Sequence, residues 1–120
     1  MLAALPLPVL AGLVLTPMMI AAGQVLFKLA SARAGGADLA GLTGLATNPY
    51  LLVALFIYGL GTLIWVYVLK SVPLNYAYPF MALTFCVVPL LAWGFLGEPL
   101  SWKLALGAAL IMTGLLVIAR

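Results

Sequence analysis

Four long apolar segments dominate this chain and limit the folds open to it. The second segment, residues 51–69, reads LLVALFIYGLGTLIWVYVL and contains no charged side chain. A helix needs about 20 apolar residues to cross the hydrocarbon core of a bilayer. We therefore predict an all-α membrane protein in which residues 1–120 form a single transmembrane domain, a bundle of four transmembrane helices. An even number of crossings would place both termini on the same side of the membrane.

Capping and helix-breaking residues mark the ends of these segments. The predicted spans cover residues 7–32, 50–69, 76–96 and 102–119. A connection rich in glycine, alanine and threonine, residues 34–48, follows the first span, and Ser101 stands at the position of an N-cap before the fourth. Pro79 and Pro89 lie inside the third span, where each removes a backbone hydrogen bond and predicts a bend.

Composition excludes several classes of protein. Hydrophobic residues make up 68% of the chain and charged residues 6%, whereas a soluble domain is about half apolar and about a quarter charged. The basic residues are scattered singly, so no basic run can follow a nucleic-acid backbone. The chain has no histidine and one cysteine, too few of the usual ligands for a metal site, and no phosphate-binding loop or catalytic triad can be assembled. We expect no nucleic acid, no metal or cofactor, and no enzymatic activity.

Two polar side chains interrupt the apolar run of the first span. Gln24 and Lys28 are four residues apart and therefore share one face of a helix. In one interpretation Lys28 extends to the lipid headgroups and Gln24 hydrogen-bonds to a neighbouring helix. In the other, both face a central cleft, where an ammonium and an amide together bind an anionic headgroup such as a phosphate. A charge inside a membrane costs about 3 kcal/mol or more, which makes such a residue a functional candidate.

Four further side chains are candidates for substrate contacts: Asn75, Tyr78, Trp65 and Thr84. Asn75 and Tyr78 stand at the start of the third span, where tyrosines commonly belong to the interfacial belt, but the bend at Pro79 favours a site at Tyr78. Trp65 either packs against the third span or lines a substrate path. Thr84 either bonds to a neighbouring helix or faces the substrate.

Small residues line the fourth span. Gly107 and Gly114 are seven residues apart, which places them on one face and is typical of a seam between paired helices. We predict that this face forms a dimer interface.

These motifs, in their order along the chain, resemble those of the four-span branch of the drug/metabolite transporter superfamily. The segments that carry the resemblance are GQVLFK, VPLNYAYP and GEPLS, together with the glycine pair of the fourth span. The resemblance covers essentially the whole chain and is strongest from Val72 to Ser101. There the chain looks like the small subunits of the aminoarabinose-phosphoundecaprenol flippase. Those subunits also carry a glycine, a glutamine and a following lysine in the first helix, Ala-Tyr-Pro in the third, and a Glu-Pro turn before the fourth.

The sister branch, the small multidrug resistance exporters, shares this architecture, and its glycine pair in the fourth helix mediates dimerisation. The resemblance places Ile20 where those exporters keep a proton-coupling glutamate. Tyr78 matches their substrate-contacting tyrosine, whereas Met81 stands at the position of their tryptophan. A chain without that carboxylate lacks both the counter-charge and the proton carrier that export of cationic drugs requires.

The resemblance implies a flippase-type transporter subunit with several spans in the bacterial cytoplasmic (inner) membrane. Its cargo would be a polyprenyl-phosphate-linked sugar or a similar anionic glycolipid, with undecaprenyl phosphate as the carrier lipid. Gln24 and Lys28 would bind the phosphate, while Tyr78, Asn75 and Trp65 would contact the headgroup or the sugar. Because four short spans enclose little volume, we expect a homodimer or a heterodimer with a related four-span subunit.

Two other functions remain open. One is a small multidrug-resistance-like exporter of small cationic molecules, which proton-coupled uptake of a quaternary ammonium compound would support. The other is a non-transporting helper subunit that stabilises or localises a larger membrane complex.

Overall fold

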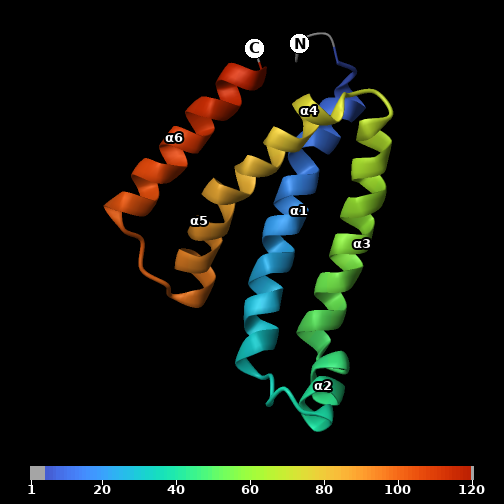
Figure 1. Cartoon of the computed structure of the whole chain (residues 1–120), viewed down its shortest axis with the longest axis vertical. Coiled ribbons are helices and arrows are strands. Elements are labelled where there is room, and N and C mark those ends of the chain that lie inside the picture. The colour runs from blue at the N-terminus through green and yellow to red at the C-terminus, as the bar shows by residue number, and fades with distance from the viewer. Residues whose placement is uncertain (1–4, 120) are drawn as a thin grey trace.

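Helices account for nearly all of the structure, a computed structural model that describes residues 5–119. Its elements are α1 (Leu7–Ala32), α2 (Leu39–Ala46), α3 (Pro49–Leu69), α4 (Leu74–Ala77), the 3-10 helix η2 (Tyr78–Leu83), α5 (Thr84–Leu96) and α6 (Trp102–Ala119). Four segments are long and apolar enough to cross a membrane: α1, α3, the stretch Leu74–Leu96, and α6. The prediction of an all-α membrane protein with four transmembrane helices is confirmed. Within the described chain, α1 begins and α6 ends at the same end of the bundle (Figure 1).

Side-chain caps set the residues at which α3 and α6 begin. Asn48 accepts a hydrogen bond from the backbone N–H of Tyr50 at 2.9 Å, and Pro49 in the first turn has no N–H to satisfy. The hydroxyl of Ser101 accepts a hydrogen bond from the backbone N–H of Leu104 at 3.1 Å. This bond confirms the predicted role of Ser101 as the N-cap of the fourth span.

A short helix, α2, occupies the connection between α1 and α3, for which the sequence analysis expected no helix. Asp38 caps it by accepting a hydrogen bond from the backbone N–H of Gly41 at 2.9 Å. The hydroxyl of Thr43 donates to the backbone carbonyl of Leu39 at 2.8 Å, so a residue type that often favours turns is accommodated inside the helix. α2 lies at the end of the bundle opposite the start of α1 (Figure 1).

The third span is not one regular helix. It passes from α4 through six residues of 3-10 helix, η2, into α5. Pro79 has no N–H to donate, and the tighter 3-10 winding occurs around it. At the junction with α5 the hydroxyl of Thr84 donates to the backbone carbonyl of Met81 at 2.7 Å. The irregularity expected at Pro79 is present, whereas α5 continues through Pro89.

The main buried core lies where α1 begins and α6 ends, and we call this the core end. Its buried residues are Val9, Leu13, Val68, Val72, Ala77, Phe80, Leu115 and Ala119. They come from α1, α3, the α3–α4 connection, α4, η2 and α6, so all four spans are held together at this end. We call the opposite end, which carries α2, the open end.

α1 is the central helix, and its most extensive contacts are with α3. Two glycines of α1 permit the close approach. A Cβ atom at Gly12 would lie 2.5 Å from Cγ2 of Val68, and a Cβ atom at Gly23 would overlap the ring of Tyr58. Small residues at these positions therefore let α3 pack against α1 at the core end and in the middle of the bundle.

α6 contacts the bundle chiefly through η2, with fewer contacts to α5. Gly107 and Gly114 lie on a face of α6 that is open. A Cβ atom added at either glycine would meet no atom within 4 Å. Their role in a dimer interface stays a prediction.

Candidate substrate site

A hydrogen bond between two transmembrane helices lies at the centre of the candidate site. The amide of Gln24 on α1 donates from Nε2 to the hydroxyl oxygen of Tyr58 on α3 at 2.5 Å. Phe27 packs against the Tyr58 ring with ring centroids 5.0 Å apart. Since the Tyr58 hydroxyl accepts this bond, its own proton and the second N–H of Gln24 remain free to donate to a ligand. The pair can therefore present two hydrogen-bond donors to an anion.

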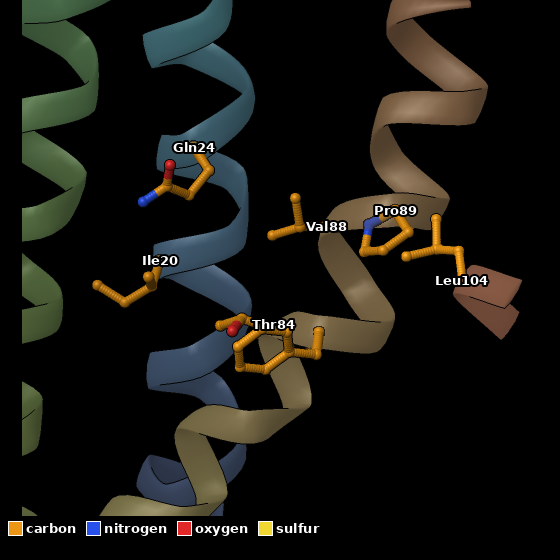
Figure 2. A pocket seen from close by; sticks show the side chains of 7 residues that line it. Ile20, Gln24, Thr84, Val88, Pro89 and Leu104 are labelled. Carbon is orange, nitrogen blue, oxygen red and sulfur yellow. The ribbon is translucent and has the colours of Figure 1, made fainter. Parts of the chain in front are cut away.

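Gln24 also lines a cavity of about 270 Å³, which we call the substrate cavity. Its lining residues are Ile20, Gln24, Thr84, Phe85, Val88, Pro89 and Leu104, from α1, α5 and α6. Figure 2 shows Thr84 and Val88 projecting from α5 toward α1, with the amide of Gln24 turned toward α3. Two of the predicted substrate contacts, Gln24 and Thr84, therefore share one cavity.

The substrate cavity is apolar apart from these two side chains. The amide of Gln24 offers donors and an acceptor, and the hydroxyl oxygen of Thr84 can accept a hydrogen bond while its proton goes to Met81. Within residues 5–119, no three His, Cys, Asp or Glu side chains lie close enough together to hold a metal ion. The arrangement is suited to binding a polar group by hydrogen bonds in surroundings of low dielectric constant.

Lys28 lies one turn beyond Gln24 on α1, toward the open end. Its side chain is exposed, and it is not part of the wall of the substrate cavity. The spacing of four residues still places Lys28 on the same side of α1 as Gln24. Lys28 therefore follows Gln24 along α1 outside the wall of the cavity, and its binding to a phosphate stays a prediction.

Asn75 and Tyr78 share a second hollow, at the start of the third span. It has a volume of about 360 Å³ and is lined by Leu74, Asn75, Tyr78 and Pro79. The Tyr78 side chain is 65% exposed. These two predicted substrate contacts are thus brought together near the core end, in a hollow separate from that of Gln24 and Thr84.

Trp65 lies in neither hollow. It is partly buried and packs against the core cluster that includes Val9 and Val68. The structure therefore gives Trp65 a packing role in the core cluster, whereas the sequence analysis considered packing against the third span or a place on a substrate path.

Tyr58 is the site residue that the sequence analysis did not select. It lies in the middle of α3, eight residues from Tyr50 and nine from Tyr67, whereas tyrosines of the interfacial belts lie near the ends of spans. A hydroxyl at that depth needs a hydrogen-bond partner. Its mid-span position was the available signal, but it could not show that Gln24 is the partner.

Comparison with known proteins decides the family. A family model described as the EamA-like transporter family matches residues 9–120, a range that includes all four spans and every residue of the substrate cavity. The chain belongs to the EamA-like transporter family. The resemblance to the drug/metabolite transporter superfamily is confirmed, and this EamA-like protein is a multi-pass membrane protein of a transporter family.

Several bacterial proteins are similar to this EamA-like protein along much of its length. A Pseudomonas fluorescens protein described as a probable 4-amino-4-deoxy-L-arabinose-phosphoundecaprenol flippase subunit ArnE is 32% identical over 108 residues, which is 90% of this chain and 94% of that protein. A Klebsiella pneumoniae protein of the same description is 39% identical over 66 residues, 55% of this chain and 59% of that protein.

A Shewanella sediminis protein described as a probable ArnF subunit of such a flippase is 39% identical over 89 residues, 69% of this chain and 60% of that protein. The similarity to the Klebsiella and Shewanella proteins therefore spans about six tenths of their lengths. No solved structure matches the chain.

Proposed function

We propose that this EamA-like protein is a subunit of a flippase-type transporter that moves a polyprenyl-phosphate-linked sugar, or a similar anionic glycolipid, across the bacterial cytoplasmic membrane. The observation that carries the proposal is the similarity to a probable flippase subunit over 90% of this chain and 94% of that protein. A match of that extent compares nearly the whole of both sequences rather than a shared fragment.

The geometry of the site supports an anionic cargo. Gln24, whose amide bonds to Tyr58 on α3, lines an otherwise apolar cavity, where bonds to a charged acceptor are stronger than in water. Lys28, one turn away on α1, supplies a positive charge for the phosphate. The exposed hydroxyl of Tyr78 and the amide of Asn75 offer a second polar hollow through which the sugar passes.

A cationic cargo fits the same site poorly. Ile20, at the position of the proton-coupling glutamate in the resembling exporters, lines the substrate cavity. The two acidic residues of the chain, Asp38 and Glu98, both lie outside the four spans. A small cation in the cavity would meet no carboxylate, so export by proton exchange is disfavoured.

A dimer is part of this proposal. The substrate cavity has a volume of about 270 Å³, whereas pockets for drug-sized ligands measure about 300–1,000 Å³. The headgroup of a lipid-linked sugar therefore needs walls from a second subunit, either another copy or a related four-span protein. The open glycine face of α6, with Gly107 and Gly114, is the proposed contact.

Reconstitution into vesicles tests the proposed function. The protein, alone and together with a related four-span subunit of the same bacterium, is placed in vesicles containing a polyprenyl-phosphate-linked aminosugar. A membrane-impermeant amine reagent then reports how fast headgroups cross. The proposal predicts protein-dependent crossing, and its absence in both preparations would contradict the proposal.

Lys28→Ala tests the phosphate contact in the same assay. Removing the positive charge is expected to lower the crossing rate by about tenfold or more, since an anion then enters the membrane without a counter-charge. Lys70→Ala is the matched control, because Lys70 is an exposed lysine just after α3 and lies in no wall of the substrate cavity. Equal rates for the two variants would show that Lys28 only anchors α1 at the headgroups.

A further inference from the structure

A wholly apolar hollow lies along the same pair of helices as the substrate cavity, and we call it the apolar groove. It has a volume of about 420 Å³ and is lined by Ala22, Val25, Leu26, Leu29, Leu91 and Phe95. Four of these residues come from α1 and two from α5, and none has a polar side chain. The Phe95 side chain is 77% exposed, so in a membrane the groove opens toward the lipid chains.

One face of α5 connects the substrate cavity with the apolar groove. Thr84, Val88, Leu91 and Phe95 follow one another at spacings of four, three and four residues and therefore lie on the same side of the helix. The first two line the cavity and the last two line the groove. At 1.5 Å per residue, the stretch from Val88 to Phe95 is about 10 Å long. The lining of this seam thus changes from partly polar to entirely apolar over about two helical turns.

Lys28 lies at the junction of the two hollows on α1. At 3.6 residues per turn, its side chain projects between the direction of Gln24, which lines the cavity, and that of Val25, which lines the groove. Lys28 is exposed, so α5 does not cover α1 at this level. A positive charge therefore stands on α1 between the residues that line the cavity and those that line the groove, although Lys28 is part of neither wall.

We infer that the apolar groove holds the isoprene units next to the phosphate of the lipid substrate. This inference rests on the proposed function. The phosphate lies between Lys28 and Gln24, the attached sugar points into the substrate cavity toward Thr84, and the rest of the polyprenyl chain stays in the bilayer. A molecule that carries a sugar, an anionic group and a branched apolar chain in that order matches the order of the substrate cavity, Lys28 and the apolar groove along α1 and α5.

The groove binds the lipid tail by fitting its shape, not by removing it from water. A lipid tail is already in an apolar solvent, so it gains from the groove only by close packing against leucine, valine and phenylalanine side chains. The groove therefore aligns the tail with the seam and so keeps the phosphate at Lys28. It also distinguishes the branched carrier lipid from the straight chains of bulk phospholipids.

A photoreactive lipid tests the inference directly. The intact protein in phospholipid vesicles is irradiated with a polyprenyl phosphate that carries a diazirine in its first isoprene unit, and the labelled residues are mapped by mass spectrometry. Labels are expected on residues 22–29 and 91–95. Ala22→Phe fills the groove and is expected to lower this labelling by about tenfold. The matched control is Ala11→Phe, an exposed alanine on α1 outside the groove, which should label like the unaltered protein.

Each outcome bears on one of the two proposals. Labels spread over the outer faces of α3 and α6, or unchanged by Ala22→Phe, would overturn the groove assignment, as would equal labelling by a phospholipid carrying the diazirine in a straight acyl chain. If Ala22→Phe does not fold, Phe95→Ala removes an exposed wall of the groove and should reduce the labelling severalfold. Groove labelling in a protein that moves no headgroup would support the groove and contradict the flippase. Headgroup movement without groove labelling would support the flippase and contradict the groove.

Discussion

The hydrogen bond between Gln24 and Tyr58 joins α1 to α3 within the segments long and apolar enough to cross a membrane. Its geometry depends on Gly23, because any side chain there would meet the Tyr58 ring. Phe27 packs against the same ring, so the hydroxyl is positioned by contacts from one turn of α1. At this scale a glycine, an aromatic residue and an amide together fix the bond between α1 and α3 at Gln24, which also lines the substrate cavity.

Gly23→Ala is expected to push Tyr58 away from α1 and to break its bond with Gln24. The added Cβ atom overlaps the ring, and overpacking of this kind typically lowers the free energy of unfolding by about 1–3 kcal/mol. Thermal unfolding in detergent measures the loss. Gly59→Ala on α3 is the control, since its Cβ atom would meet no atom within 4 Å. Equal stability of the two variants would rule out the close contact between Gly23 and Tyr58.

Tyr58→Phe keeps the ring and removes the hydroxyl. Because interhelical hydrogen bonds in membranes contribute about 0.6–2 kcal/mol, we expect a small loss of stability and a several-fold slower headgroup crossing in reconstituted vesicles. Tyr67→Phe makes the same change at a tyrosine of α3 that is 51% exposed and should leave the rate unaltered. A Tyr58→Phe protein as fast as this control would exclude the hydroxyl from the site.

At the scale of elements, the third span determines where the two hollows are. Its 3-10 stretch, η2, contacts α1 and α6 at the core end, while α5 continues beside α1 to Leu96 and carries the face that lines the cavity and the groove. The end of α5 is set by Gly97, which has φ +70°. Its backbone N–H and that of Glu98 both donate to the carbonyl of Ala92. The length of α5, and with it the position of Phe95, therefore depends on a residue that tolerates a left-handed backbone.

Gly97→Ala places a Cβ atom in this left-handed conformation and is expected to lower the free energy of unfolding by about 1 kcal/mol. Gly94→Ala, three residues earlier on the same helix and in open space, should instead be neutral or raise stability by up to about 1 kcal/mol, because alanine is the better helix former. Denaturant titration in mixed micelles compares the free energies of unfolding of the two variants. A Gly97→Ala protein as stable as Gly94→Ala would mean that the end of α5 does not depend on the left-handed residue.

At the scale of the whole molecule, all four spans converge at the core end, while α1 and α3 stay packed together toward the open end. The main core cluster draws on all four of them at the core end, whereas α6 makes few other contacts and leaves its glycine face open. A helix held at one end can present that face to a second subunit without disturbing the core. An open face on a helix held at one end is what the proposed dimer would require.

Gly114→Leu tests the assembly. A leucine side chain on the glycine face prevents close approach of a second helix, so we expect the dimer dissociation constant to rise by about tenfold or more. This dissociation constant is measured by energy transfer between fluorescently labelled copies of the protein in lipid bilayers. Gly94→Leu, the same change at another open glycine, serves as the control. Unchanged association of the Gly114→Leu protein would move the interface to another surface.

Local chemistry along the chain determined the number of spans, their approximate ends and the cap at Ser101, because length, hydropathy and capping are properties of neighbouring residues. Tertiary structure alone decided which faces meet. Membrane helices are apolar all round, so hydrophobic periodicity does not tell which side of a span packs and which side meets lipid. That is why Trp65 could not be assigned to the core in advance, why Tyr58 was not recognised as the partner of Gln24, and why only the folded bundle showed that Lys28 lies outside the wall of the substrate cavity.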